Sequence, residues 1–232
     1  MRESYIERRD QLTTYFDQTA AKAWQALTSS EPVNRIRRTV RAGRDDMRAT
    51  LLGWLPEDLS GRTLLDAGCG TGALSIEAAR RGARVVGIDV AANLVEVARR
   101  RSADVPMTGS VEFRVGDMLG DAPDEVDFVV AMDSLIHYEA DDVVKAVAEL
   151  TGRARHGVLF TSAPWTPLLA AMHFTGRLLP RQEHRAPAIV PLKTRRLMAD
   201  IDAAVGASGW SASKTARVTS GFYISQAIGV CR

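Results

Sequence analysis

Three glycines and a later aspartate are spaced as in a site for a nucleoside cofactor. The segment Leu64–Gly72 reads LLDAGCGTG and places Gly68, Gly70 and Gly72 between a β-rich run and a helical stretch. Glycine permits positive φ and lets a ligand approach the backbone, and the start of the following helix offers free N–H groups. Asp89 ends the next β-rich run, 21 residues after Gly68, where an acid can accept hydrogen bonds from two ribose hydroxyls.

Asp66 distinguishes this loop from an ordinary dinucleotide site. Glycine spacing alone does not, because Ala73 stands where the looser fingerprint GxGxxG/A admits alanine. Asp66 lies two residues before Gly68, at the end of the strand, where a carboxylate can meet an ammonium group that NAD lacks. The alternative is a tight strand–helix turn around a buried Cys69. The order of strand, acid and glycines favours a cofactor with an ammonium group.

Further candidate residues follow the ends of the next β-rich runs. They are Val90, Asp117, Met118, Met132, Asp133, His137 and Tyr138. The carboxyl ends of parallel strands meet at one edge of a sheet, so these side chains should lie close together. The alternatives stay open: Asp117 as a turn or helix-cap residue, His137 packed under an N-terminal arm, and Tyr138 or Val90 as core.

Five short β-rich runs separated by helical stretches position these residues. The runs are Thr63–Ala67, Arg84–Asp89, Val111–Val115, Val126–Met132 and Gly157–Thr161. Apolar strands alternating with helices indicate a parallel sheet covered on both faces. Two further runs, Ser211–Thr219 and Phe222–Cys231, predict a hairpin that makes the sheet mixed. We expect an α/β fold with a doubly wound, mostly parallel, seven-stranded sheet.

The chain divides into four expected segments. Residues 1–60 lack β-rich runs and predict a helical N-terminal arm or cap, which includes a helix from about Val33 to Trp54. Residues 61–163 form the cofactor-binding core. Residues 164–207 predict a helical insertion or lid, and residues 208–232 the hairpin that completes the sheet.

Composition excludes several classes of protein. The chain is 46% hydrophobic and 25% charged, with a net charge of +2 that is too balanced to predict nucleic-acid binding. Its apolar stretches are far shorter than the roughly 20 residues of a spanning helix, and no signal-peptide core is visible at the start. Two cysteines and four scattered histidines suit neither a disulfide framework nor a zinc site. A cytoplasmic enzyme without a metal site of its own is expected.

The glycine loop and its acids resemble the signature of class I S-adenosylmethionine-dependent methyltransferases. The resemblance implies a Rossmann-like fold and S-adenosyl-L-methionine as cofactor, with S-adenosyl-L-homocysteine as product. Asp117 resembles that family's adenine-binding acid. The cofactor-binding residues implied are Asp66, Gly68, Cys69, Gly70, Gly72, Asp89, Val90, Asp117, Met118 and Met132.

A longer resemblance covers nearly the whole chain and narrows the acceptor. YFDQTA at 15–20, VRAGR at 40–44, AMDSLIHY at 131–138, FTSAP at 160–164 and HRAPAIVP at 184–191 look like magnesium-protoporphyrin IX methyltransferases. That family methylates one propionate of a magnesium porphyrin in (bacterio)chlorophyll synthesis, so magnesium is expected only within the substrate. The implied substrate contacts are Tyr15, Trp24, Arg41, Arg44, Asp133, Tyr138 and Trp165.

The same resemblance suggests what the protein meets in the cell. The porphyrin-binding subunit of magnesium chelatase is a candidate partner for handing over the porphyrin. The apolar insertion also suits peripheral contact with a membrane.

The expected chemistry needs no general base, because a propionate is already ionised near pH 7. His137 then acts as an orienting hydrogen-bond partner. Two alternatives stay open. A quinone or catechol O-methyltransferase would need His137 as the base for a hydroxyl acceptor, and a non-catalytic module would only bind S-adenosylmethionine.

Overall fold

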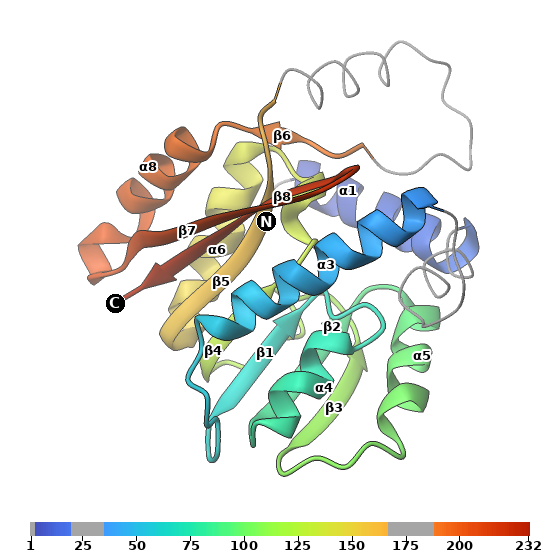
Figure 1. The fold of residues 1–232 in the computed structure, drawn as a ribbon. Helices are drawn as coiled ribbons and strands as arrows, with labels where there is room; N and C mark the ends of the chain where they lie inside the picture. Colours follow the sequence, from blue (N-terminus) through green and yellow to red (C-terminus); the bar gives the residue numbers. More distant parts are fainter. Residues whose placement is uncertain (1–2, 20–34, 167–187) are drawn as a thin grey trace.

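A mixed sheet of eight strands organises the fold (Figure 1). The computed structural model describes residues 3–19, 35–166 and 188–232. Seven strands follow the order β3-β2-β1-β4-β5-β8-β7, and the two-residue β6 pairs with the end of β5. The strands are β1 (Thr63–Ala67), β2 (Arg84–Asp89), β3 (Ser110–Val115), β4 (Val126–Ala131), β5 (Ala154–Pro164), β6 (Pro191–Leu192), β7 (Ser211–Ser220) and β8 (Tyr223–Cys231).

The strand directions confirm the expected mostly parallel sheet. Strands β1 to β6 pair in parallel, whereas β8 runs antiparallel to both β5 and β7. Strand β5 is longer than the expected Gly157–Thr161. Ala154 pairs with Val126 of β4 at one end and Ser162 with Gln226 of β8 at the other. These pairings extend the strand through Arg155 and His156. Both side chains are exposed and polar, so the hydropathy pattern does not indicate that the strand begins before Gly157.

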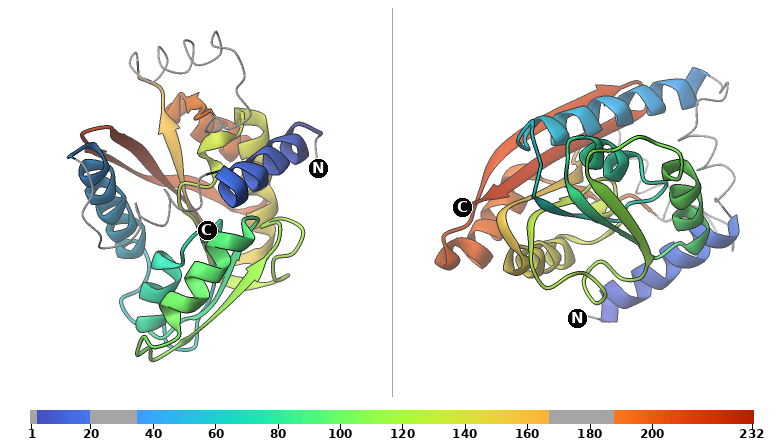
Figure 2. Two further views of the ribbon diagram at one scale, coloured as in Figure 1. Left: turned by 90° about the vertical axis from the view of Figure 1, so that its right-hand side faces the viewer. Right: turned by 90° about the horizontal axis from the view of Figure 1, so that it is seen from below.

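Helices cover both faces of the sheet (Figure 2). Helices α3 (Arg35–Gly53), α4 (Ala73–Arg80) and α5 (Ala92–Ser102) lie on one face. Helices α1 (Glu3–Thr14), α6 (Ala140–Arg153) and α8 (Thr194–Val205) lie on the other. In β1, the adjacent Leu64 and Leu65 are both buried but belong to hydrophobic clusters on opposite faces. The two-residue period of a strand therefore buries apolar side chains on both sides.

Helix α3 is the long helix expected from about Val33 to Trp54. Its Met47 and Leu51 are fully buried against the sheet. One turn earlier, Gly43 lies directly against the ring of Tyr223 on β8, because a Cβ on this glycine would be 2.5 Å from Tyr223 Cδ1. Glycine therefore lets α3 approach the C-terminal hairpin closely.

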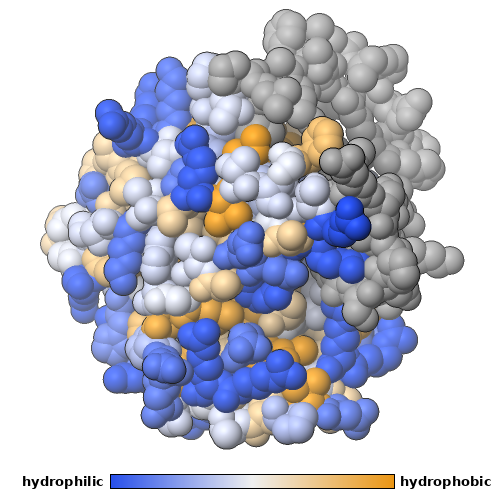
Figure 3. All heavy atoms as spheres, in the orientation of Figure 1, coloured by the Kyte–Doolittle hydropathy of each residue, from blue (hydrophilic) through white to orange (hydrophobic). Residues whose placement is uncertain are grey.

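The division into four segments stays a prediction. Residues 167–187 of the expected insertion, and the arm residues 20–34, lie outside the described residues. Within the described part, no helix is long and apolar enough to cross a membrane. The face drawn in Figure 3 carries mainly hydrophilic residues, with smaller hydrophobic groups between them.

Strand order locates the binding crevice. Strand β1 lies between β2 and β4, so the chain first extends the sheet on one side of β1, through β2 and β3, and then on the other side, through β4 and β5. Open α/β sheets bind ligands outside the carboxyl ends of the strands at such a reversal. Here the carboxyl end of β1 leads into the glycine loop, and that of β4 leads to Asp133.

Candidate active site

The glycine loop after β1 has a backbone that other residues would strain. Gly68, Gly70 and Gly72 have φ values of 84°, 53° and 78°, in the left-handed region. A Cβ on Gly68 would be 2.4 Å from Ser134 Cβ. Gly72 caps the start of α4 rather than lining the cavity. The glycines therefore bring the loop against the end of β4 and leave its backbone open to a ligand.

Asp89, at the end of β2, holds the loop from the other side. Its Oδ2 accepts a hydrogen bond of 2.8 Å from Gly70 N, and its Oδ1 accepts one of 2.9 Å from Ala91 N. Each carboxylate oxygen has a second lone pair. Burial raises the pKa of Asp89 above its usual range. The side chain lines the cavity and can accept hydrogen bonds from a diol.

Asp66 is a buried acid beneath the loop. Its side chain accepts a 2.5 Å hydrogen bond from Ser75 Oγ on α4. Burial raises the pKa of Asp66 to about 7, although the Ser75 hydrogen bond opposes this shift. A neighbouring cation would return the pKa toward its ordinary value, since it favours the ionised form. Asp66 therefore suits a positively charged ligand group.

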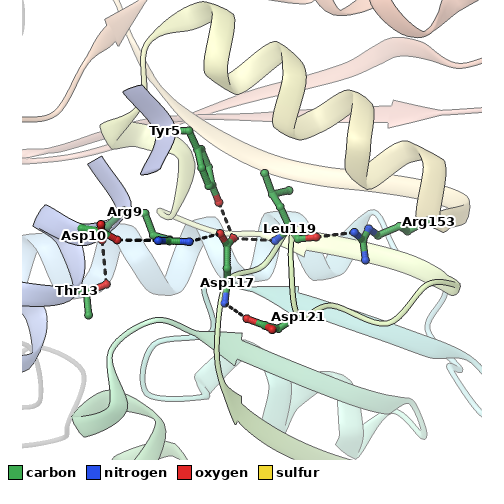
Figure 4. Close-up of polar contacts among 8 residues, drawn as sticks. All are labelled: Tyr5, Arg9, Asp10, Thr13, Asp117, Leu119, Asp121 and Arg153. Atoms are coloured by element: carbon green, nitrogen blue, oxygen red, sulfur yellow. Dashed lines mark hydrogen bonds and ion pairs between the residues drawn. The ribbon is translucent and has the colours of Figure 1, made fainter. Parts of the chain in front are cut away.

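Asp117, after β3, is held by the N-terminal helix (Figure 4). Tyr5 Oη donates to its Oδ1 at 2.8 Å, and Arg9 Nη1 lies 3.0 Å from its Oδ2. The N–H of Leu119 also donates to Oδ1, at 2.9 Å. Burial raises the pKa of Tyr5, which keeps the phenol protonated as a donor. Asp117 therefore anchors α1 as well as lining the cavity.

Helix α1 crosses the carboxyl edge of the sheet. At its start, Ser4 Oγ donates to Asp142 of α6 at 2.8 Å. At its far end, the π-helical turn Tyr15–Thr19 contacts α5, because Asn93 N donates to Asp17 Oδ1 at 2.9 Å. The helix thus covers one side of the cavity from α6 to α5.

The cavity at this edge has a volume of about 470 Å³ and two walls of opposite net charge. One wall carries Asp66, Asp89 and Asp117, and the last of these pairs with Arg9 of α1. The other wall carries three arginines of α3, spaced as one helix face, of which one pairs with Asp133 and another with Asp45. They are Arg41, Arg44 and Arg48. Such a cavity can hold a cation beside the acids and an anion beside the arginines.

His137 lies between these walls on the short turn Leu135–His137. Its Nδ1 is 3.3 Å from the carbonyl oxygen of Ala188, and its ring meets that of Phe16 edge-on. A carbonyl only accepts, so this contact places a proton on Nδ1. In the neutral ring, Nε2 is then an acceptor.

The structure brings most of the expected site residues together at this cavity. Those in its lining are Asp66, Gly68, Cys69, Gly70, Asp89, Val90, Asp117, Met118, Met132, Asp133, His137, Tyr138, Arg41 and Arg44. Tyr15, which packs on Phe16, and Trp165, which is 48% exposed, are not among the residues that line the cavity. Trp24 lies outside the described residues.

The contribution of α1 to the cavity was not expected from the sequence. Three of its side chains and one from the turn after it line the cavity, namely Tyr5, Arg9 and Leu12 of α1 and Phe16 of the turn. Their spacing of four, three and four residues follows one helix face. This periodicity was present in the sequence and could have identified them.

Two family models match the chain. Residues 131–232 match the C-terminus of magnesium-protoporphyrin IX methyltransferase, and residues 64–157 match a methyltransferase domain. The magnesium-protoporphyrin O-methyltransferase of Rhodobacter capsulatus is 43% identical over 98% of both chains. This chain belongs to the magnesium-protoporphyrin IX methyltransferase family. Membership confirms the S-adenosylmethionine-dependent O-methyltransferase expected from the sequence.

Two other members of the magnesium-protoporphyrin IX methyltransferase family agree. The chloroplastic magnesium protoporphyrin IX methyltransferase of Arabidopsis thaliana is 33% identical over 92% of this chain and 68% of its own length. The crystal structure of the Synechocystis PCC 6803 enzyme with bound SAH has a TM-score of 0.83 and 27% identity, and covers 97% of this chain and 99% of that one. The class I methyltransferase fold is therefore confirmed.

The site residues fit S-adenosylmethionine in this methyltransferase. The glycine loop gives close backbone approach, and Asp66 and Asp89 match an ammonium group and a ribose. Ser134 Oγ is buried in the cavity wall, and no described residue offers it a hydrogen-bond partner. Buried hydroxyls usually have a partner, so a bound ligand can supply one.

Proposed function

We propose that this enzyme transfers a methyl group from S-adenosylmethionine to one propionate carboxylate of magnesium-protoporphyrin IX. The product is the monomethyl ester of (bacterio)chlorophyll synthesis. The opposite charges of the two cavity walls carry this proposal. A cationic methyl donor matches the three aspartates, and an anionic acceptor matches the arginines of α3.

The acidic wall holds the donor. Asp66 pairs with its ammonium group and Asp89 with its ribose hydroxyls, while Asp117, Met118 and Val90 border its adenine. When bound, S-adenosylmethionine supplies a methyl group on a positively charged sulfur, which keeps the bonding electrons as the carboxylate oxygen attacks. The remaining work of the chain is to position both reactants and exclude water.

His137 orients the acceptor rather than removing a proton. A carboxylate is ionised near pH 7, so no proton has to leave. The neutral His137 ring, with Nδ1–H directed at Ala188 O, presents a lone pair at Nε2. It donates to a carboxylate only when it is the imidazolium ion. Helix α1, which covers the cavity, excludes water from this contact.

A second candidate rests on the same histidine. A lone pair at Nε2 is what a base needs to accept a proton from a hydroxyl. This arrangement favours a quinol or catechol acceptor if the arginine wall plays no part. The two candidates share the donor site and differ only in the acceptor.

Turnover of methyl-labelled S-adenosylmethionine with a panel of acceptors tests the proposal. The panel contains magnesium-protoporphyrin IX, its dimethyl ester, a catechol and a quinol. We expect label only in the monomethyl ester made from the first. Label in the catechol or quinol would support the second candidate. Cofactor binding without transfer to any acceptor would indicate a binding module.

Delivery of the porphyrin is part of the proposal. Trp165 and Ile189 are 48% and 43% exposed and flank residues 167–187. The backbone bond from Trp165 N to Leu192 O, at 2.8 Å, holds the two ends of this insertion together. We assign this apolar edge to the porphyrin-binding subunit of magnesium chelatase and to peripheral membrane contact. Cosedimentation with the subunit and with lipid vesicles, for wild type and Trp165→Ala, tests both assignments.

A further inference from the structure

Asp133 has an unusual backbone conformation at the end of β4. Its φ is 56°, and it is the non-glycine residue with positive φ in the described part of the chain. Aspartate tolerates this conformation better than most residues, but such positions cluster at functional sites. The backbone N–H of Asp133 donates to Thr161 Oγ1 on β5 at 2.7 Å. The turn therefore has a fixed direction at the cavity wall.

The carboxylate of Asp133 is shared by side chains from three elements. Arg44 Nη1 on α3 lies 2.8 Å from Oδ2. Tyr223 Oη on β8 donates at 3.1 Å to Oδ1, and Thr161 Oγ1 lies 3.3 Å from the same oxygen. The side chain is only 4% exposed. These contacts hold the Asp133 carboxylate in the cavity lining, where the sequence predicted a substrate contact.

Tyr223 is built into this network. Burial and the nearby Asp133 raise the pKa of its phenol, so Tyr223 remains a donor. Gly43 makes room for its ring on α3. The position of the phenol is thus fixed by packing, and through Asp133 it fixes Arg44.

Arg44 is the cation that this network presents to the cavity. Its side chain is 18% exposed, and it lines the cavity between Arg41 and Arg48. A guanidinium is a planar fork that can bind one carboxylate while another holds its orientation. Partial burial strengthens such a charge-assisted hydrogen bond.

We propose that Arg44 binds the propionate that is not methylated, and that Asp133 and Tyr223 are positioning residues for its guanidinium. This inference rests on the proposed porphyrin substrate, which carries two propionates. Hydrogen bonds from a guanidinium to the attacking oxygen would stabilise its charge more in the ground state than in the transition state and slow the transfer. Arg44 therefore suits the carboxylate that keeps its charge throughout.

Binding of three porphyrins separates the possible roles of Arg44. The experiment follows porphyrin fluorescence as each porphyrin is titrated against the protein with S-adenosyl-L-homocysteine present. The three porphyrins are magnesium-protoporphyrin IX, its monomethyl ester and its dimethyl ester. We expect Arg44→Gln to weaken binding of the first two by about ten- to a hundredfold and to leave the dimethyl ester unchanged. Arg38→Gln is the matched control, since Arg38 is an exposed arginine of the same helix outside the cavity lining.

The positioning residues are tested by Tyr223→Phe and Asp133→Asn, since asparagine also tolerates positive φ. Each substitution should weaken binding of the two carboxylate-bearing porphyrins about two- to tenfold. Each should also raise KM for magnesium-protoporphyrin IX more than it lowers kcat. Loss of a buried hydrogen bond lowers the melting temperature of each variant, but the affinities for S-adenosyl-L-homocysteine and for the dimethyl ester should not change, as they would if these residues were merely structural.

Each other outcome overturns a distinct claim. Equal weakening of all three porphyrins by Arg44→Gln would make Arg44 a packing residue. Weakening of the diacid alone would assign Arg44 to the reacting carboxylate. Unchanged binding in Tyr223→Phe and Asp133→Asn would remove their positioning role. If the wild type bound none of the three porphyrins, the proposed function itself would fail. If the wild type preferred the diacid and Arg44→Gln kept the same preference, only the inference about Arg44 would be rejected.

Discussion

The phenol of Tyr5 donates a 2.8 Å hydrogen bond to Asp117, 112 residues later in the chain. Arg9 approaches the other oxygen of the same carboxylate at 3.0 Å. Asp117 was expected to bind the adenine of the cofactor. Because it also anchors α1, occupation of the adenine site and docking of the helix should support each other.

Loss of the Tyr5 hydroxyl should loosen α1. Tyr5→Phe keeps the stacking on Tyr138 but removes the hydrogen bond, which is worth about 0.5–1.5 kcal/mol. Hydrogen exchange of residues 3–14 should quicken accordingly, and S-adenosyl-L-homocysteine should restore part of the protection. Arg9→Gln should act in the same direction, while Arg8→Gln is the control because its guanidinium contacts Gln11 on the same helix. Unchanged exchange in both Tyr5→Phe and Arg9→Gln would show that Asp117 does not anchor the helix.

Cofactor affinity should rise with pH between 6 and 7. The pKa of Asp66 is about 7, so the carboxyl of the free protein is mostly protonated at pH 6. Binding an ammonium group needs the ionised form, and an α-amino group stays protonated through this range. The ionised fraction therefore predicts an increase of about fivefold. Calorimetry of wild type and Asp66→Asn measures it. The variant should bind more weakly and without this slope, and a flat wild-type profile would contradict the role of Asp66.

Asp89→Ala should weaken cofactor binding by roughly 5- to 150-fold, the equivalent of two hydrogen bonds to a ribose. The same substitution removes acceptors for Gly70 N and Ala91 N, so the melting temperature is measured alongside. Asp104→Ala, at an exposed acid, is the control. A folded Asp89→Ala protein with wild-type affinity would reject the assignment of this acid.

The pH dependence of single turnover should reveal the role of His137. If its imidazolium orients a carboxylate, the rate should fall as pH rises and the ring loses its proton. His137→Ala should lose this fall and, as a positioning variant, retain turnover reduced by about 10²-fold. A hydroxyl acceptor predicts the opposite pH dependence, a rate that rises with pH, because the neutral ring is then the active form. A wild-type rate that climbs with pH and becomes flat in the variant would establish His137 as a base.

The cofactor half of the site could be predicted because its residues are close in sequence. The strand, the glycine loop and Asp66 occupy one continuous segment, and Asp89 ends the next strand. Local propensity and spacing determine such an arrangement. The parallel order of the central strands followed from the same alternation.

The acceptor half of the site depends on packing between distant elements, which the spacing of residues in the sequence does not indicate. Tyr223 reaches Asp133 because β8 pairs with β5 in one register and because Gly43 admits its ring. Neither contact has a local signal in the sequence. The expectation that Asp133 touches substrate came from its place at the end of β4 and stays a prediction. The contacts of its oxygens with Arg44, Tyr223 and Thr161 depend on packing between distant elements.

The position of Tyr223 on β8 also sets an order of assembly during translation. Every strand of the parallel core, with Asp66, Asp89 and Asp117 at its edge, is synthesised before β8. Domains begin to fold as they leave the ribosome. A nascent chain can thus form its donor site while the arginine wall still awaits the hairpin that orients Arg44. Competence to bind the methyl donor would then precede competence to recognise the acceptor.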